Sequence, residues 1–324
     1  MLASFHASSV ARWFSAAELK RYTITAMNAL ISPRQAKTVK RRALLLLCLL
    51  ACHPAVLAAP ALRVAVGVPV LQTFVQRIGG ERVETLILQG SGDPHAFEPS
   101  GRQIAALADA RLYILAGLPF ESAWLPRLQA IHPGLMVMDL RRAVPIRPLD
   151  DPGPTRGDAD RPADPHVWTD PAGALRLVDA IRDQLTALDP AGQPSYETAS
   201  RRLRRDLEAL EAEITPLLAP QRGRALLVFH PGWGYLADHH GLVQVPLEVG
   251  GREPGALQLQ RIMALARKER AGALFLQPGH GDRLARQVAG ELGIPVVVAD
   301  PLAADYFGNV RILARALATA SVAP

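Results

Sequence analysis

The 324-residue sequence has only two cysteines, Cys48 and Cys52, and both lie within its first 59 residues. The chain from residue 60 onward therefore has no thiolate to bind a metal or act as a nucleophile, and no disulfide to stabilise it. The glycine and serine motifs of nucleotide-binding proteins and serine hydrolases are also missing. These absences remove the commonest sequence signs of covalent and nucleotide chemistry.

Most of the chain also lacks net charge, although the formal charge of the whole sequence is +6 and its pI is about 9.7. Eight of the 36 basic residues but only one of the 30 acidic residues lie in 1–59, which leaves 28 basic against 29 acidic residues over 60–324. The basic character thus belongs to the N-terminal segment. Because the remainder has no field that would attract a phosphate backbone, we expect no nucleic-acid partner.

Residues 1–59 have the pattern of a leader with a secretory signal peptide. A basic stretch that ends at Arg42 precedes the apolar run ALLLLCLLAC, and small residues follow at cleavage spacing. We expect cleavage after Ala58 or Ala59, which would release the chain into the periplasm. No later run is long and apolar enough to predict a membrane span.

Two features of this leader leave alternatives open. The sequence LLAC resembles a lipobox, so cleavage before Cys52 and a lipid anchor on that residue is the alternative to a soluble product. Residues 1–26 do not resemble a signal, and Met27 is therefore an alternative start to Met1.

After the leader, short apolar runs rich in β-formers alternate with helical patterns, which predicts parallel sheets covered by helices. Eight runs are predicted to be buried strands: 62–68, 82–89, 111–117, 135–140, 225–229, 242–248, 273–277 and 295–299. Helices are expected over 100–109, 119–131, 171–188, 232–240, 256–271, 281–292 and 304–319. Residues 141–163 are rich in Pro, Asp and Arg without periodicity and are expected to form a surface loop.

One long amphipathic helix is expected over 192–218, where apolar residues recur at spacings of three and four and the arginine pairs predict a solvated face. Four predicted strands precede it and four follow it. The predicted fold class is α/β, with two parallel-sheet lobes joined by one long, rigid helix. The expected divisions are a leader (1–59), an N-terminal lobe (60–190), a linking helix (191–219) and a C-terminal lobe (220–324).

Four polar residues stand at positions where open parallel sheets bind ligands, beyond the carboxyl ends of strands or in an equivalent loop. His95 follows the second predicted strand, His230 ends the fifth, Asp300 ends the eighth, and His166 lies in the loop before the helix at 171–188. Three imidazoles and one carboxylate suit zinc, with manganese or iron(II) as alternatives. Four protein ligands would leave no position for an activated water, which favours binding over catalysis.

An Asp-Pro step precedes two of these histidines, His95 and His166. Proline restricts the backbone on both sides of its peptide bond, so the step would hold each imidazole in a fixed direction. Asp93 and Asp164 are expected to orient the two rings. The remaining histidines of the body are expected to lie at the surface (His132, His239, His240) or at the rim of the cleft as an accessory donor (His280).

Five segments together resemble the zinc/manganese solute-binding proteins of bacterial ABC importers, the TroA-like group, over residues 62–320. They are GSGDPHAFEPSGRQIAALADARLYILAGLPFESAW, DPHVWTDP, VFHPGWGYLADHHGL, GGREPGALQL and VVVADPLAADYFGNV. The resemblance implies two α/β lobes on one rigid helix with a metal in the cleft. It also implies that His95, His166, His230 and Asp300 are the four metal ligands.

The zinc-type branch of this family fits best, because manganese-type members generally carry a carboxylate where this chain has His230. The resemblance implies capture of Zn2+ in the periplasm by a monomer that delivers it to an ABC-transporter permease, with a metallochaperone as a further partner and no enzymatic activity. It also implies structural roles for Glu98 and Glu121. One departure is that many zinc-type members carry a long His-rich acidic loop, whereas residues 141–163 contain no histidine.

Two other classes of function remain alternatives from the sequence. An exported zinc hydrolase could use the same histidines with Asp93 as a base, but it would need an open coordination position. A surface receptor or adhesion protein would require the lipid anchor at Cys52.

Overall fold

The computed structural model describes residues 60–88, 97–150, 161–279 and 281–320, and its strands form two four-stranded parallel sheets. The first sheet has the order β2-β1-β3-β4, and its strands are β1 (Leu62–Val66), β2 (Val83–Ile87), β3 (Leu112–Leu115) and β4 (Met136–Asp139). The second has the order β6-β5-β7-β8, and its strands are β5 (Ala225–Val228), β6 (Val243–Pro246), β7 (Leu274–Leu276) and β8 (Val296–Val298). All eight predicted strands are confirmed.

The two sheets repeat one topology. In each, the first strand of the lobe pairs with its two successors in the chain order, β1 with β2 and β3, and β5 with β6 and β7. The chain therefore places β2 on one side of β1 and β3 on the other, so the strand order reverses at β1. In the second sheet the order reverses at β5 in the same way. Such switch points open a crevice at the carboxyl ends of the strands, where ligands bind.

Helices cover the faces of both sheets. Those of the first lobe are α3 (Pro69–Gly79), α4 (Gly101–Ala106), α5 (Pro119–Ile131) and α6 (Pro171–Leu188). Those of the second lobe are α8 (Gly234–His240), α9 (Ala256–Lys268), α10 (Asp282–Leu292) and α11 (Tyr306–Thr319). The helix α3 is the one that the sequence patterns did not single out. Within the described ranges, no helix combines the length and hydropathy needed to cross a bilayer.

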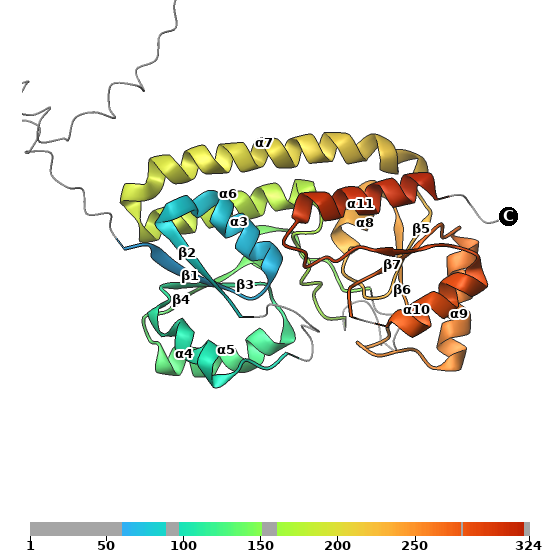
Figure 1. Cartoon of the computed structure of the whole chain (residues 1–324), viewed down its shortest axis with the longest axis horizontal. Coiled ribbons are helices and arrows are strands. Elements are labelled where there is room, and N and C mark those ends of the chain that lie inside the picture. The colour runs from blue at the N-terminus through green and yellow to red at the C-terminus, as the bar shows by residue number, and fades with distance from the viewer. Residues whose placement is uncertain (1–59, 89–96, 151–160, 280, 321–324) are drawn as a thin grey trace, which may run out of the picture. The chain divides into compact units, whose positions relative to one another are not determined.

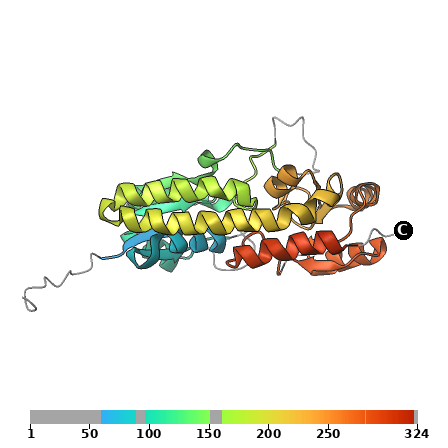
Figure 2. The same cartoon turned by 90° about the horizontal axis from the view of Figure 1, so that it is seen from above.

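The linking helix α7 (Gln193–Leu218) has 26 residues, which corresponds to a length of about 39 Å. It packs against α3, α6 and α11, and Figures 1 and 2 show it running beside α6 and then α11. Its buried side chains repeat at helical spacing: Tyr196, Ser200, Leu203, Leu207, Leu210, Ile214 and Leu218. The predicted architecture of two α/β lobes with one long helix is confirmed.

The outer face of α7 carries the arginine pairs. Arg201, Arg202 and Arg205 are exposed, as expected, whereas Arg204 is half-buried and its guanidinium donates to Asp179 on α6 at 2.7 Å. This face is therefore solvated, with one cross-link to the neighbouring helix.

One hydrophobic core continues from the first lobe along α7 into the second. It contains side chains of β1, β3, α3, α6 and α7 together with Leu226, Val228 and Phe275 of the second sheet. A separate, smaller core lies on the other face of the second sheet and includes Leu227, Leu274 and side chains of α9 and α10. The alternation along β5 places Leu226 and Leu227 in different cores, as expected for a strand covered on both faces.

Glu121 has the structural role expected of it. Its buried carboxylate accepts hydrogen bonds from the backbone N–H groups of Ala116, Gly117 and Leu118 and from the hydroxyl of Tyr113, at 2.6 to 3.1 Å. These bonds close the turn between β3 and α5. Glu98 is exposed.

The leader predictions, including cleavage at Ala58 or Ala59, the anchor at Cys52 and the start at Met27, fall on 1–59 and lie outside the described residues. Of the predicted loop 141–163, residues 140–143 form a short 3-10 helix and Pro148 pairs with Ala163 in an isolated antiparallel bridge.

Candidate metal-binding site

His166 is held by the turn that starts α6. Its backbone N–H donates to the carboxylate of Asp164 at 2.9 Å, and the backbone N–H of Thr169 donates to its carbonyl at 3.2 Å. Asp170 then caps α6 by accepting the backbone N–H of Gly173 at 2.9 Å. The backbone of the turn is thus fixed on both sides of the histidine, with Pro165 restricting the residue before it.

The imidazole of His166 is buried and has a defined direction. Its Nδ1 lies 2.8 Å from Oδ1 of Asp164, which confirms the predicted contact between these two residues. With Nδ1–H donated to the carboxylate, the lone pair of Nε2 points away from Asp164. Burial lowers the pKa of His166 despite the opposing effect of Asp164, so the ring stays neutral and able to bind a metal.

His230 is oriented by the same arrangement from the other lobe. It follows β5 at the switch point of the second sheet, and its Nδ1 lies 2.7 Å from Oε2 of Glu248, which follows the neighbouring strand β6. Because β5 and β6 are parallel neighbours, their carboxyl ends bring these two side chains together. The backbone N–H of Glu248 also donates to the carbonyl of Phe229 at 3.0 Å.

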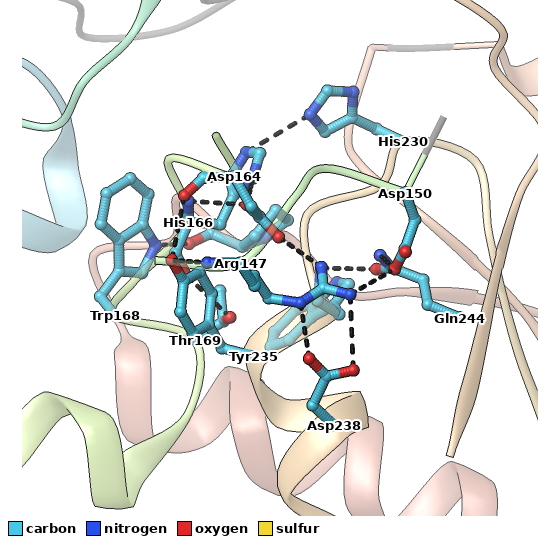
Figure 3. A network of polar contacts seen from close by, with 12 residues as sticks. Arg147, Asp150, Asp164, His166, Trp168, Thr169, His230, Tyr235, Asp238 and Gln244 are labelled. Carbon is cyan, nitrogen blue, oxygen red and sulfur yellow. Dashed lines mark hydrogen bonds and ion pairs between the residues drawn. The ribbon is translucent and has the colours of Figure 1, made fainter. Parts of the chain in front are cut away.

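The two Nε2 atoms of His166 and His230 face each other at 3.4 Å, as Figure 3 shows. A tetrahedral zinc ion with Zn–N distances of about 2.05 Å separates its ligand atoms by about 3.3 Å. If each Nδ1 donates its proton to the neighbouring carboxylate, each Nε2 carries a lone pair that can bind a metal. The spacing and the tautomers therefore match those of two ligands of one transition-metal ion.

Asp164 is held in turn by Arg147, which connects the two lobes. The guanidinium donates to Asp164 at 2.8 Å, to Asp150 at 2.9 Å and to Asp238 of α8 at 2.7 Å (Figure 3). Although burial alone would raise it, hydrogen bonds from His166 and Arg147 hold the pKa of Asp164 below its usual value. The carboxylate is therefore ionised and accepts the His166 N–H as a charge-assisted hydrogen bond.

Trp168 has a bridging role. Its buried indole N–H donates to the carbonyl of Pro301 at 2.7 Å, so the turn after His166 is bound to the loop that starts at Asp300 in the other lobe. A Cβ on Gly232 would lie only 2.7 Å from Pro301, so this glycine allows the segment after His230 to approach the same loop.

Asp300 lies in this loop directly after β8, as predicted. Its Oδ1 accepts the backbone N–H of Leu302 at 2.9 Å and lies 3.4 Å from the amide nitrogen of Gln277. Among the described residues, the carboxylate of Asp300 does not lie close enough to both the His166 and His230 rings for the three to share one metal ion. The structure thus brings the two histidines together and places Asp300 on the adjoining loop.

The other predicted donors have different outcomes. His95, Asp93 and His280 fall on residues outside those that the structure describes. His132 is half-buried and His239 is exposed. The expectation of a surface position is wrong for His240, which is buried with a fractional exposure of 8% because it packs at the end of α8 against α7.

Two residues of the site were missed by the sequence analysis. Glu248 could have been found, since it ends a predicted strand just as His230 and Asp300 do. Arg147 lies in a stretch interpreted as a surface loop, and no spacing in the sequence connects it with Asp164 or Asp238. Only the packing of the two lobes does so.

Comparisons with known proteins identify the family of the chain. The family model described as the periplasmic zinc-uptake complex component A, ZnuA, matches residues 64–320. The high-affinity zinc uptake system protein ZnuA of Paracoccus denitrificans is 27% identical over 258 residues, which cover 70% of this chain and 79% of that protein. A solved structure of a zinc-bound ZnuA deletion mutant is 34% identical with a TM-score of 0.73, and covers 82% of this chain and 99% of that one.

A longer relative is the zinc-binding lipoprotein AdcA of Streptococcus pneumoniae, which is 27% identical over 245 residues. The match covers 71% of this chain but 48% of the lipoprotein, so the chain spans about half the length of that relative.

Proposed function

We propose that this chain, which belongs to the ZnuA family of periplasmic zinc-uptake components, captures Zn2+ and delivers it to the permease of an ABC transporter. The observation that carries the proposal is the 3.4 Å separation of the Nε2 atoms of His166 and His230. Each ring is anchored by a carboxylate at Nδ1, which is the usual outer contact of metal-binding histidines. The metal is cargo, and the protein is a binding protein and not an enzyme.

The proposed ligands are His95, His166, His230 and Asp300. His166 and Asp300 belong to loops that Trp168 joins, and His230 comes from the second lobe, so the metal would be held by both lobes. A shift of the Asp300 loop towards the two rings would complete the set with His95. Four ligands would close a tetrahedral site and leave no position for a reactive water.

Zinc is favoured over manganese by the donor set. Imidazole nitrogen suits Zn2+, whereas Mn2+ favours carboxylate, carbonyl and water oxygen. Manganese or iron(II) remains the alternative cargo of the same site.

The proposed biological setting follows from the leader. We infer export by the signal peptide in 1–59 and action as a periplasmic monomer, with the lobes at 60–190 and 220–324 and the linking helix at 191–219. Lipidation of Cys52 is the alternative, and the chain would then be an anchored surface receptor. A periplasmic metallochaperone is a further proposed partner.

Metal titration tests the proposal. Purified protein is stripped with a chelator and titrated with Zn2+ in the presence and absence of excess Mn2+, with His230→Ala as the test variant. We expect tight zinc binding that Mn2+ does not displace, and a loss of at least 100-fold in affinity in the variant, because removal of one of four ligands opens the site.

His132→Ala is the matched control, since it removes an imidazole that is not part of the set. Equal zinc affinity of the His230→Ala variant and the control would overturn the assignment. Preferential binding of Mn2+ would overturn the choice of cargo.

A further inference from the structure

A second group of metal-binding side chains lies apart from His166 and His230. It consists of Asp170 at the start of α6, Glu211 in the middle of α7, and His239 and His240 at the end of α8. One ligand atom from each of the four lies within 4.8 Å of all the others. The group thus draws on the first lobe, the linking helix and the second lobe.

The distances within this group fit a transition metal. Nδ1 of His239 lies 2.8 Å from Oδ1 of Asp170 and 3.9 Å from Oε1 of Glu211, and Nε2 of His240 lies 3.7 Å from the same Oε1. Ligand atoms of a tetrahedral zinc ion are about 3.3 Å apart. These three spacings lie on both sides of this value and within about 0.6 Å of it.

Ordinary hydrogen bonding does not account for the group. Among the described residues, Nε2 of His240, Oε2 of Glu211 and the hydroxyl of Tyr306 are buried and have no hydrogen-bond partner. The side chain of His240 is only 5% exposed. A buried polar atom without a partner destabilises the fold. A cation would satisfy both the imidazole nitrogen and the carboxylate oxygen.

The two histidines of the group differ in their electrostatics. Although burial opposes it, the hydrogen bond to Asp170 raises the pKa of His239. Burial lowers the pKa of His240, so its ring is neutral and offers a lone pair. Tyr306 from α11 interacts with the charges of Asp170 and Glu211, and burial raises the pKa of its hydroxyl well above the usual value. The phenol is therefore neutral.

The other contacts of these residues leave the donor atoms available. Asp170 caps α6 mainly through Oδ2, which accepts the backbone N–H of Gly173 at 2.9 Å. Its Oδ1 accepts the backbone N–H of Ala172 at 3.4 Å and also faces His239. Oε1 of Glu211 accepts the hydroxyl of Thr215 at 2.8 Å, while Oε2 is unpaired. A metal would replace the contact between His239 and Asp170 and keep the helix cap.

We propose that Asp170, Glu211, His239 and His240 form a second binding site for a divalent transition metal, with Zn2+ as the fitting ion. Two imidazoles and two carboxylates would fill a tetrahedral shell around the ion. The ion would connect α6, α7 and α8 and so fix the two lobes to the linking helix.

Counting bound metal tests this proposal. The chelator-stripped full chain is titrated with Co2+, whose visible absorption reports tetrahedral coordination, and with Zn2+ against a chromophoric chelator. The wild type is expected to bind one equivalent more than His239→Ala, a variant chosen because this ring is exposed and its removal spares the core. Glu211→Gln, which preserves shape, is expected to lose the same equivalent.

Two measurements on variants distinguish this second site from the proposed cargo site that contains His166 and His230. In a His230→Ala background, Zn2+ should still raise the melting temperature, and the added His239→Ala change should abolish that rise. The His132→Ala control should bind as the wild type does. Equal stoichiometry in the wild type, His239→Ala and Glu211→Gln, with all three folded by circular dichroism, would refute the second site whatever the His230 variant shows.

Discussion

At the scale of single residues, the candidate site depends on two carboxylates that are not among the proposed ligands. Asp164 and Glu248 each accept the Nδ1–H of one histidine, and each comes from the same lobe as the ring that it orients. Such contacts fix the tautomer and raise the basicity of the ligand nitrogen. The metal affinity of the candidate site should therefore depend on Asp164 and Glu248 as well as on the proposed ligands.

Glu248→Gln should weaken zinc binding by about 10- to 100-fold, because the amide is a weaker acceptor and no longer holds the His230 ring as firmly. Competition with a chromophoric chelator would measure the change. Glu253→Gln, at an exposed glutamate five residues later, is the control and should bind zinc as tightly as the wild type. An unchanged affinity in Glu248→Gln would show that the ring is positioned by packing alone.

The residues of the site differ in how far the sequence predicted them. His230 was predictable because parallel strands place their carboxyl-end residues at one edge, whereas His166 lies in the loop before α6. The resemblance to a known family marked both positions. Glu248 follows the same rule but needed the strand order β6-β5 to become a neighbour of His230. Arg147 and Trp168 act between lobes, and such contacts depend on packing that no local pattern encodes.

At the scale of elements, α7 determines how the two lobes are joined. Its buried face belongs to the core that both lobes share, and its exposed face is charged. The strands and most helices were predictable, since buried parallel strands are short apolar runs and amphipathic helices repeat every three or four residues. The helix α3 was not singled out, because its apolar residues include the β-branched Val70, Val75 and Ile78, which suit a strand as well as a helix.

Leu207→Ala should lower the free energy of unfolding by about 2 to 5 kcal/mol, because it leaves a cavity in the middle of this shared core. Urea denaturation followed by circular dichroism would measure it. Arg205→Ala, two residues earlier on the exposed face, should change the free energy of unfolding by less than about 0.5 kcal/mol. Similar effects of the two changes would contradict the central place of α7 in the core.

The end of α6 carries a pH-sensitive contact. The Arg82 guanidinium donates to Asp189 at 2.8 and 3.0 Å and, together with the Tyr196 hydroxyl, holds the pKa of Asp189 below its usual value. A carboxyl group whose pKa is lower in the folded state stabilises the fold fully above its unfolded pKa, about 3.9. This contribution is lost as the pH falls through the folded value.

Asp189→Asn should therefore lower the free energy of unfolding at pH 7, and the difference from the wild type should shrink as the pH falls below about 4. Urea titrations at pH 7 and pH 3 would show it. Asp183→Asn, on the exposed side of α6, is the control. A gap between wild type and Asp189→Asn that is the same at both pH values would rule out the ion pair as its cause.

At the scale of the whole molecule, polar contacts connect the two lobes beside the shared core. Trp168 to Pro301 is one of them, and Arg147 to Asp238 is another. Trp168 lies two residues after His166, and the guanidinium of Arg147 also donates to Asp164. The geometry of the first lobe's ligand loop is thus tied to the position of the second lobe.

Trp168→Phe should reduce zinc affinity several-fold and lower the free energy of unfolding by about 1 to 3 kcal/mol, because the carbonyl of Pro301 loses its buried donor. Zinc titration and urea denaturation of the same preparation would measure both effects. Trp124→Phe, whose half-buried indole stacks with Arg127, is the control. A loss of stability with unchanged zinc affinity would show that the contact does not position the site.

The continuous packing of α7 against both lobes also affects the change in heat capacity on metal binding. A receptor that swings open by a wide hinge buries apolar surface as it closes, and this produces a large negative change in heat capacity. Here the interface that would have to open is already part of a core running through α3, α6, α7 and α11. Calorimetry of zinc binding at several temperatures should therefore give an enthalpy that hardly varies with temperature.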